Sequence, residues 1–292
     1  MPPVPEPRTT GPRAESPEVT ELKRLKTLQP ELAEAADLHL ALLDVQRRVQ
    51  GRAAVPWMDV APERVRRAQD EGTPLLRFED LPLDWTEFRL VFRQTADVLR
   101  RFDALEPDDY QAIQALSRDG NSLDPFVARW FNQTAAPGAV GAAPAPKTPV
   151  SQDAMDQVLA LAMRPFLERC ADVIQQRVDF TAWRRGCCPL CGGEPEFAVV
   201  TASGVRTLIC GRCTARWPFC DRACPFCGND DRAALPSFSS PDGRYRLYAC
   251  DACRRYLKAY DAREGGRPVM LAVDSVATLP LDAAAVGRGY RG

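Results

Sequence analysis

The stretch that decides the fold is Cys188-Pro189-Leu190-Cys191-Gly192, which recurs further along the chain as Cys224-Pro225-Phe226-Cys227-Gly228. In each copy two residues separate the cysteines, a spacing that lets a tight turn aim both thiolates at one metal ion. The glycine that follows accepts the backbone geometry that such a turn needs. The two copies therefore predict two metal-binding turns.

A further Cys-x-x-Cys pair follows each of these turns. Cys210/Cys213 follow the first turn after 18 residues, and Cys250/Cys253 follow the second after 22. Each linking stretch contains a turn signal, Ser203-Gly204 or Asp242-Gly243, which indicates a β-hairpin. The four pairs therefore predict an internal duplication of one small module.

Two such turns joined by a hairpin form a tetrahedral site of four thiolates, which suits zinc or a rubredoxin-type iron. A module of about 30 residues is too small to fold on an apolar core alone, so metal binding should supply folding energy. We therefore expect two metal ions, iron or zinc, and the spacing does not choose between these metals. The predicted ligands are Cys188, Cys191, Cys210 and Cys213 in site one, and Cys224, Cys227, Cys250 and Cys253 in site two.

Composition and charge change along the 292 residues. All but one of the 11 cysteines lie between Cys187 and Cys253, where basic residues are also in excess. We predict an α+β protein in which an α-helical N-terminal domain precedes two tandem rubredoxin-like or zinc-ribbon modules. The predicted bounds are 1–17 for a disordered tail, 18–182 for the helical domain with a flexible insert at 134–149, 183–219 and 220–263 for the modules, and 264–292 for a C-terminal tail.

Apolar residues recur at helical spacing through the first part of the chain. Pro30 predicts a division of the first helical stretch into two helices. Asp84 and Ser151 are the predicted N-caps of two later helices, and Pro165 predicts a kink or an interruption of the second of them. Shorter helices are predicted near 62–70, 107–117 and 123–132.

The remaining cysteines and the single histidine have other predicted roles. Cys170 and His39 lie on apolar helix stripes, which indicates buried core side chains. Cys187 adjoins a ligand and is an alternative to Cys188, although only Cys188 begins the repeated motif. Cys220 lies between the modules and is the best candidate for a reactive thiol, and we favour an incidental role for it.

Several classes of function are excluded or disfavoured. The chain starts without the basic and apolar regions of a secretory signal, and no run approaches the ~20 apolar residues of a membrane span. We therefore expect a cytoplasmic protein, whose thiols stay reduced. With one histidine and no phosphate-binding loop or nucleophile elbow, an enzyme is not expected.

Residues 159–282 resemble the formate dehydrogenase accessory protein (FdhE) family. The resemblance rests on the run Leu161–Arg169, on its continuation into Trp183–Gly192, on the paired modules and on the stretch Asp274–Asp282, and the early helices with Gln46 are also similar. It implies a cytoplasmic, non-enzymatic assembly factor that binds the catalytic subunit of a formate dehydrogenase and makes it active. It also implies that the eight paired cysteines form iron-associated, rubredoxin-like sites. The insert at 134–149, Cys187 and Cys220 depart from the family pattern.

Two other functions are open. Basic residues interleave with aromatic residues in the modules, which fits a zinc-ribbon protein that binds nucleic acid. The basic residues are Arg184, Arg185, Arg212, Arg216, Arg222, Arg254, Arg255 and Lys258, and the aromatic ones are Trp183, Trp217, Tyr256 and Tyr260. The basic excess is modest, so a solvated face or a surface for an acidic protein partner explains it equally well, and we expect no nucleic acid.

A thiol–disulfide oxidoreductase would need a low-pKa thiol at a helix start in a βαβ context, which the sequence does not show. The oligomeric state does not follow from the sequence.

Overall fold

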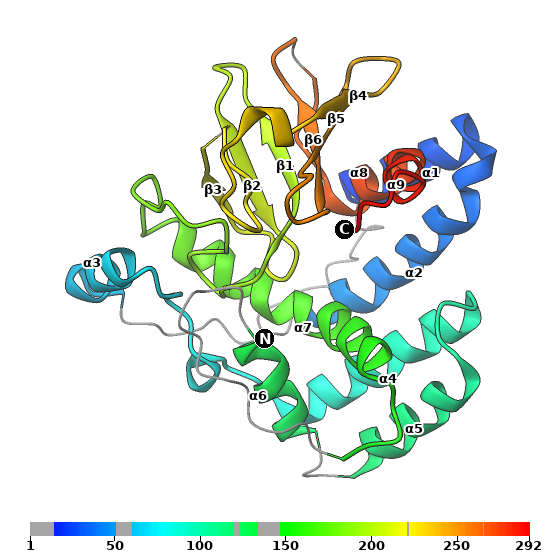
Figure 1. The fold of residues 1–292 in the computed structure, drawn as a ribbon. Coiled ribbons are helices and arrows are strands. Elements are labelled where there is room, and N and C mark those ends of the chain that lie inside the picture. The colour runs from blue at the N-terminus through cyan, green and yellow to red at the C-terminus, as the bar shows by residue number, and fades with distance from the viewer. Residues whose placement is uncertain (1–14, 51–59, 120–122, 134–146, 221, 265) are drawn as a thin grey trace, which may run out of the picture.

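The structure is a computed structural model that describes residues 15–50, 60–119, 123–133, 147–220, 222–264 and 266–292. A helical part comes first, a single sheet follows, and two short helices end the chain (Figure 1). The predicted α+β architecture, with a helical part followed by two ribbon-like modules, is confirmed. Most of the predicted tail 1–17 and of the predicted insert 134–149 lies outside the described residues. No helix in the described ranges combines the length and apolarity that crossing a membrane requires.

The helical part has the elements that the sequence predicts. The side chain of Asp84 accepts hydrogen bonds from the backbone N–H groups of Thr86 and Glu87, and that of Ser151 accepts one from Ala154, so both predicted N-caps are confirmed. Pro30 begins a short 3-10 turn that separates the first two helices, as predicted. The elements are α1 (Pro17–Leu28), η1 (Pro30–Leu32), α2 (Ala33–Gln50), α3 (Pro62–Glu71), η2 (Phe78–Asp80), α4 (Trp85–Arg101), α5 (Pro107–Arg118), α6 (Asp124–Asn132) and α7 (Gln152–Gln175).

Helix α7 continues through Pro165, so of the predicted kink or interruption the interruption is wrong, and the kink stays a prediction. A proline has no backbone N–H, and the carbonyl four residues earlier, that of Leu161, therefore loses its helical donor. The buried side chain of Gln46 on α2 supplies the missing donor, with its Nε2 at 3.0 Å from the Leu161 oxygen. This tertiary hydrogen bond satisfies the carbonyl and allows the helix to continue.

Helix α7 lies between the other helices and the sheet. It packs against α2 and α4, and the sheet lies beyond it in Figure 1. One continuous cluster of buried side chains runs from Phe88 and Phe166 to the cysteines of site one. The helical part and the first module therefore share a core. The domain bounds given above stay predictions.

The two modules form one six-stranded sheet with the order β3-β2-β1-β6-β5-β4. Within each module neighbouring strands are antiparallel, whereas β1 pairs with β6 in parallel and joins the modules. The second module thus repeats the strand order of the first, and the first strand of one module lies beside the last strand of the other. The strands are β1 (Pro195–Val200), β2 (Arg206–Cys210), β3 (Arg216–Pro218), β4 (Ser237–Ser239), β5 (Tyr245–Ala249) and β6 (Tyr256–Asp261), with η3 (Arg232–Ala234) before β4.

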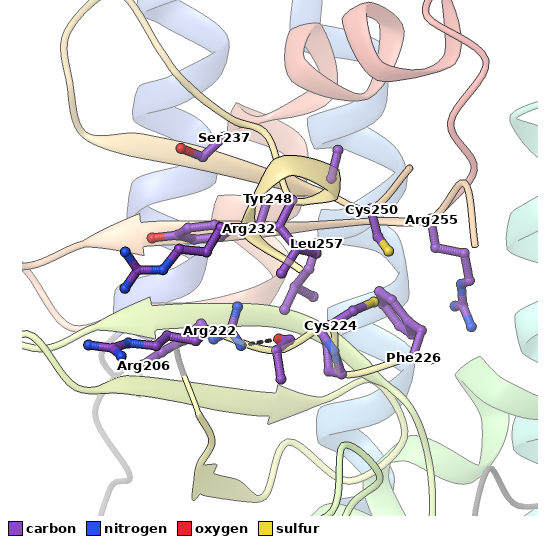
Figure 2. A pocket seen from close by; sticks show the side chains of 14 residues that line it. Arg206, Arg222, Cys224, Phe226, Arg232, Ser237, Tyr248, Cys250, Arg255 and Leu257 are labelled. Carbon is purple, nitrogen blue, oxygen red and sulfur yellow. Dashed lines mark hydrogen bonds between the residues drawn. The ribbon is translucent and has the colours of Figure 1, made fainter. Parts of the chain in front are cut away.

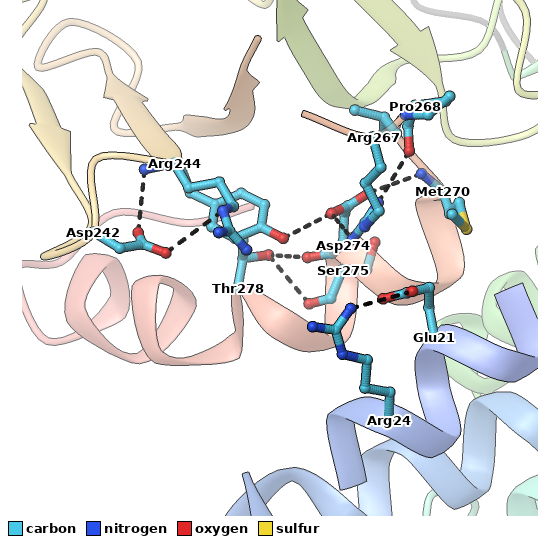
Figure 3. A network of polar contacts seen from close by, with 12 residues as sticks. Glu21, Arg24, Asp242, Arg244, Arg267, Pro268, Met270, Asp274, Ser275 and Thr278 are labelled. Carbon is cyan, nitrogen blue, oxygen red and sulfur yellow. Dashed lines mark hydrogen bonds and ion pairs between the residues drawn. The ribbon is translucent and has the colours of Figure 1, made fainter. Parts of the chain in front are cut away.

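The segment predicted as a C-terminal tail contains α8 (Leu271–Ala277) and α9 (Leu279–Val286). Asp274 on α8 is fully buried and accepts hydrogen bonds from the Tyr245 hydroxyl (2.7 Å), from Arg267 (2.8 Å) and from the backbone N–H of Met270 (2.8 Å). Figure 3 shows this network, which connects α8 to the second module. Helix α8 also packs against α1, so the end of the chain ties the second module to the first helix.

Candidate metal centres

The four Cys-x-x-Cys turns share one backbone conformation. In each turn the residue after the second cysteine has a positive φ, and its N–H donates to the carbonyl of the first cysteine at 2.8–3.1 Å. Glycine fills this position in the first and third turns, as the sequence predicts. The second and fourth turns place Thr214 (φ 55°) and Arg254 (φ 57°) there, a conformation that costs these side chains some strain. The turn geometry is therefore imposed even where no glycine supports it.

Site one brings together Cys188, Cys191, Cys210 and Cys213, the four residues that the sequence groups. The Sγ of Cys191 lies 3.5 Å from that of Cys210 and 3.5 Å from that of Cys213. Four thiolates in a tetrahedron around a zinc ion, each at ~2.3 Å from it, lie about 3.8 Å apart. The site therefore fits a tetrahedral ion.

Site two brings together Cys224, Cys227, Cys250 and Cys253. The Sγ atoms of Cys224 and Cys253 are 3.8 Å apart, and those of Cys227 and Cys250 are 3.7 Å apart. These distances also match the edges of a tetrahedron around one ion. The two groups are separate, as the two-module prediction requires, and the identity of the metal does not follow from them.

The surroundings of site one hold its turns on the helical part. All four cysteines are completely buried. The backbone N–H groups of Leu75 and Leu76 donate to carbonyls of the first turn, and the Arg164 guanidinium on α7 donates to the Gly211 carbonyl of the second at 2.7 Å. The Arg212 guanidinium in turn donates to three carbonyls that include that of Trp130. Site one is thus built into the main core.

The surroundings of site two leave it at the surface. Cys227 is exposed and Cys253 is half-exposed. The third turn approaches the start of the first module so closely that a Cβ on Gly186 would lie 1.8 Å from the Pro225 carbonyl oxygen. On another side of the site, Cys224 and Cys250 line a pocket of about 310 Å³ (Figure 2). Site two is therefore accessible to a partner, whereas site one is not.

No family model matches the chain. The chain is 27% identical over 146 residues to an FdhE homologue of Aquifex aeolicus, which covers 48% of this chain and 50% of that protein. It is also 32% identical over 109 residues to the FdhE homologue of Serratia proteamaculans. That match covers 36% of this chain and 35% of that protein. The matched segments thus span half or less of these relatives.

A solved structure extends the comparison to nearly the whole fold. The crystal structure of the FdhE protein from Pseudomonas aeruginosa matches with a TM-score of 0.60 and 20% identity, over 94% of this chain and 91% of that chain. The resemblance to the FdhE family is confirmed. The likeness of fold therefore extends over nearly the whole chain and is not confined to the two modules.

Within this FdhE fold the three remaining cysteines lie apart from the two groups. Burial raises the pKa of the Cys170 thiol to about 12 and that of Cys187 to about 11, so both thiols stay protonated at neutral pH. The carbonyl of Cys187 accepts a hydrogen bond from the Trp183 indole. Cys220 is exposed in the stretch between the modules.

The interleaved basic and aromatic residues of the modules do not form a stacking surface. Trp183 and Trp217 are buried, and each indole N–H donates to a backbone carbonyl. Lys258 pairs with Asp282 at 2.6 Å, and Arg255 pairs with Glu194. The aromatic half of the alternation therefore reflects core packing, which weakens the observation that favoured nucleic acid, while Arg184, Arg185 and Arg222 remain exposed.

Two features of the structure carry chemistry that the sequence reasoning missed. Arg232 lines the pocket beside site two, and its only signal was the basic excess of the modules. His39, predicted to lie in the core, is only partly buried and lines a second cavity of about 370 Å³ with Glu168. Burial lowers the pKa of His39 to about 4 and raises that of Glu168 to about 7. Only the packing of α2, α7 and the C-terminal segment brings these two residues together.

Proposed function

We propose that the chain is a cytoplasmic accessory factor that binds the catalytic subunit of a formate dehydrogenase and is needed for the maturation or activity of that enzyme. The observation that carries the proposal is the FdhE fold with one Cys₄ group in the core and the other at the surface. In this arrangement the helical part and site one form a rigid base. Site two then faces the partner.

The eight paired cysteines are the proposed ligands of the two metal ions. Iron at such a site supplies one-electron redox chemistry, and zinc supplies structure alone. The chain's own residues would bind and orient the partner rather than transform a substrate, so we propose that it is not itself an enzyme. Accessory proteins of this kind act through contact, and the surface of site two is the contact that the fold offers.

The competing functions have weaker support. A nucleic-acid interface needs exposed aromatic or basic side chains in a continuous surface, and the aromatic residues in question are buried. A thiol–disulfide oxidoreductase needs a reactive thiol at a helix start. In the described residues, the Cys-x-x-Cys pairs instead lie in the turns of the sheet region, each facing a second pair.

Deletion of the gene tests the proposal. Formate dehydrogenase activity should be lost while the catalytic polypeptide is still made, and the wild-type gene supplied in trans should restore activity. The purified chain should also retain the purified catalytic subunit in a pull-down. Normal activity in the deletion strain would end this proposal. Salt-sensitive retention of RNA or DNA, without retention of the subunit, would favour the nucleic-acid function instead.

A further inference from the structure

The pocket beside site two has two chemically different ends. It holds about 310 Å³, near the lower limit of pockets that take small groups. Figure 2 shows Arg222, Arg232 and Tyr248 toward one end, and Phe226, Arg255 and the paired cysteines Cys224 and Cys250 toward the other. Arg255 is paired with Glu194, so the side chain that the second end offers to a ligand is the apolar ring of Phe226. A ligand that fills the pocket therefore needs a polar part for the first end and an apolar part for the second.

The charge of the pocket is unbalanced. None of the described residues that line it is an aspartate or a glutamate, and the negative charge at the pocket is that of the site-two thiolates around their ion, which Cys224 and Cys250 bring to one end. Arg206 donates to the carbonyls of Cys220 and Ala223, and Arg255 is paired with Glu194, so these two guanidinium groups have structural roles. Arg222 and Arg232 are exposed, and across the described residues no ion pair with a carboxylate is found for either. They leave two cationic groups for an incoming anion.

The aromatic rings distinguish between anionic ligands. The Arg255 guanidinium lies 3.7 Å from the centroid of the Phe226 ring, and that of Arg206 lies 5.5 Å from that of Tyr248. Each ring therefore already has a cation over one face, which leaves less room for a stacked nucleobase. Guanidinium groups bind carboxylates in bidentate fashion, and the apolar end suits an aliphatic side chain.

We propose that this pocket binds an acidic peptide segment, with its carboxylates on Arg222 and Arg232 and a neighbouring apolar side chain against Phe226 and Leu257. The inference deepens the proposed function. It rests on that proposal because it takes the acidic segment to belong to the catalytic subunit. Because Cys224 and Cys250 line the same pocket, the segment would lie directly against site two. The partner and the metal centre would then meet at one place.

The test uses the full chain and a fluorescent hexapeptide that alternates glutamate and leucine, read by fluorescence anisotropy. The variant is Arg222→Glu with Arg232→Glu. Its matched control is Arg24→Glu with Arg66→Glu, which reverses two exposed arginines of the helical part, whose side chains are 67% and 66% exposed. Metal content is measured in all three proteins, so that a damaged site two is recognised.

The pocket variant should bind the peptide at least tenfold more weakly than wild type, and the control should stay within twofold. A peptide with glutamine in place of glutamate should not bind. Equal losses in both variants would overturn the proposal in favour of a general charge effect. Binding of AMP or inorganic phosphate without binding of the peptide would also overturn it, in favour of a phosphate site.

The catalytic subunit separates this inference from the proposed function. If the wild-type chain retains the subunit and the pocket variant retains it equally well, the pocket inference fails and the accessory function stands. If the peptide binds as expected but the subunit is not retained, the accessory function fails and the pocket remains a site for acidic peptides.

Discussion

Sites one and two each group four cysteines in the same kind of turn, with Sγ–Sγ distances of 3.5 Å in site one and 3.7–3.8 Å in site two, and they differ in what covers them. The four cysteines of site one are buried in a core shared with the helical part, whereas Cys227 of site two is exposed. A metal site inside a close-packed core stabilises the elements around it. The same site at a surface can contact a partner. The two copies of one module therefore differ in exposure because their neighbours differ.

The largest expected effect breaks one site at a time. Cys191→Ser should empty site one and lower the free energy of unfolding by at least about 3 kcal/mol, a fraction of the ~10–16 kcal/mol of structural zinc binding. Cys227→Ser should empty site two and cost the helical part less than about 1 kcal/mol, because its surroundings are largely solvent. Metal stoichiometry with an absorption spectrum, followed by urea unfolding, measures both effects.

Each of these variants should keep one equivalent of metal, and Cys220→Ser is the matched control that should keep two. Ferric iron on four thiolates is coloured and zinc is not, so the same sample identifies the metal. Loss of both metals in Cys191→Ser would show that the two groups depend on one another. Equal destabilisation by the two ligand changes would contradict the division of roles.

A smaller effect is expected where the third turn meets the start of the first module. Gly186→Ala puts a Cβ 1.8 Å from the Pro225 carbonyl oxygen, so the turn that carries Cys224 and Cys227 must move. We expect a loss of about 1–3 kcal/mol, typical of overpacking. A chelator should remove the metal of site two faster than in wild type, with site one unchanged. The control is Gly287→Ala, because Gly287 has a right-handed helical conformation. It should leave the rate of metal removal unchanged at both sites.

The smallest expected effect concerns the hydrogen bond between Gln46 and the Leu161 carbonyl of helix α7. Gln46→Leu leaves the Leu161 carbonyl without a donor, which should cost about 1–2 kcal/mol in urea unfolding. Adding Pro165→Ala returns a backbone N–H to that carbonyl and should recover most of the loss. Because Arg164 beside Pro165 holds the Gly211 carbonyl, any change in metal retention should appear at site one. A double variant as unstable as Gln46→Leu would contradict this account of α7.

The grouping of the ligands could be predicted because it is local. Two residues between cysteines, a turn signal and a second pair are all read within one module. The role of Gln46 could not be predicted in this way, since its partner lies on another helix far along the chain. The same holds for Asp274, which lies in a segment predicted as a tail and is buried by contacts with Tyr245 and Arg267. The sequence shows that Asp274 is charged, but only the fold shows which groups surround and neutralise that charge.

The sequence by itself determined the duplicated modules, their eight cysteines and the helices with their caps, since each depends on spacing and on side chains a few residues apart. Only the tertiary structure decided that β1 pairs with β6 in parallel, that site one is buried and that site two faces a pocket of arginines. Burial is a property of everything that packs around a residue. Two modules with nearly the same motif can therefore lie in different surroundings, and the motif alone does not distinguish them.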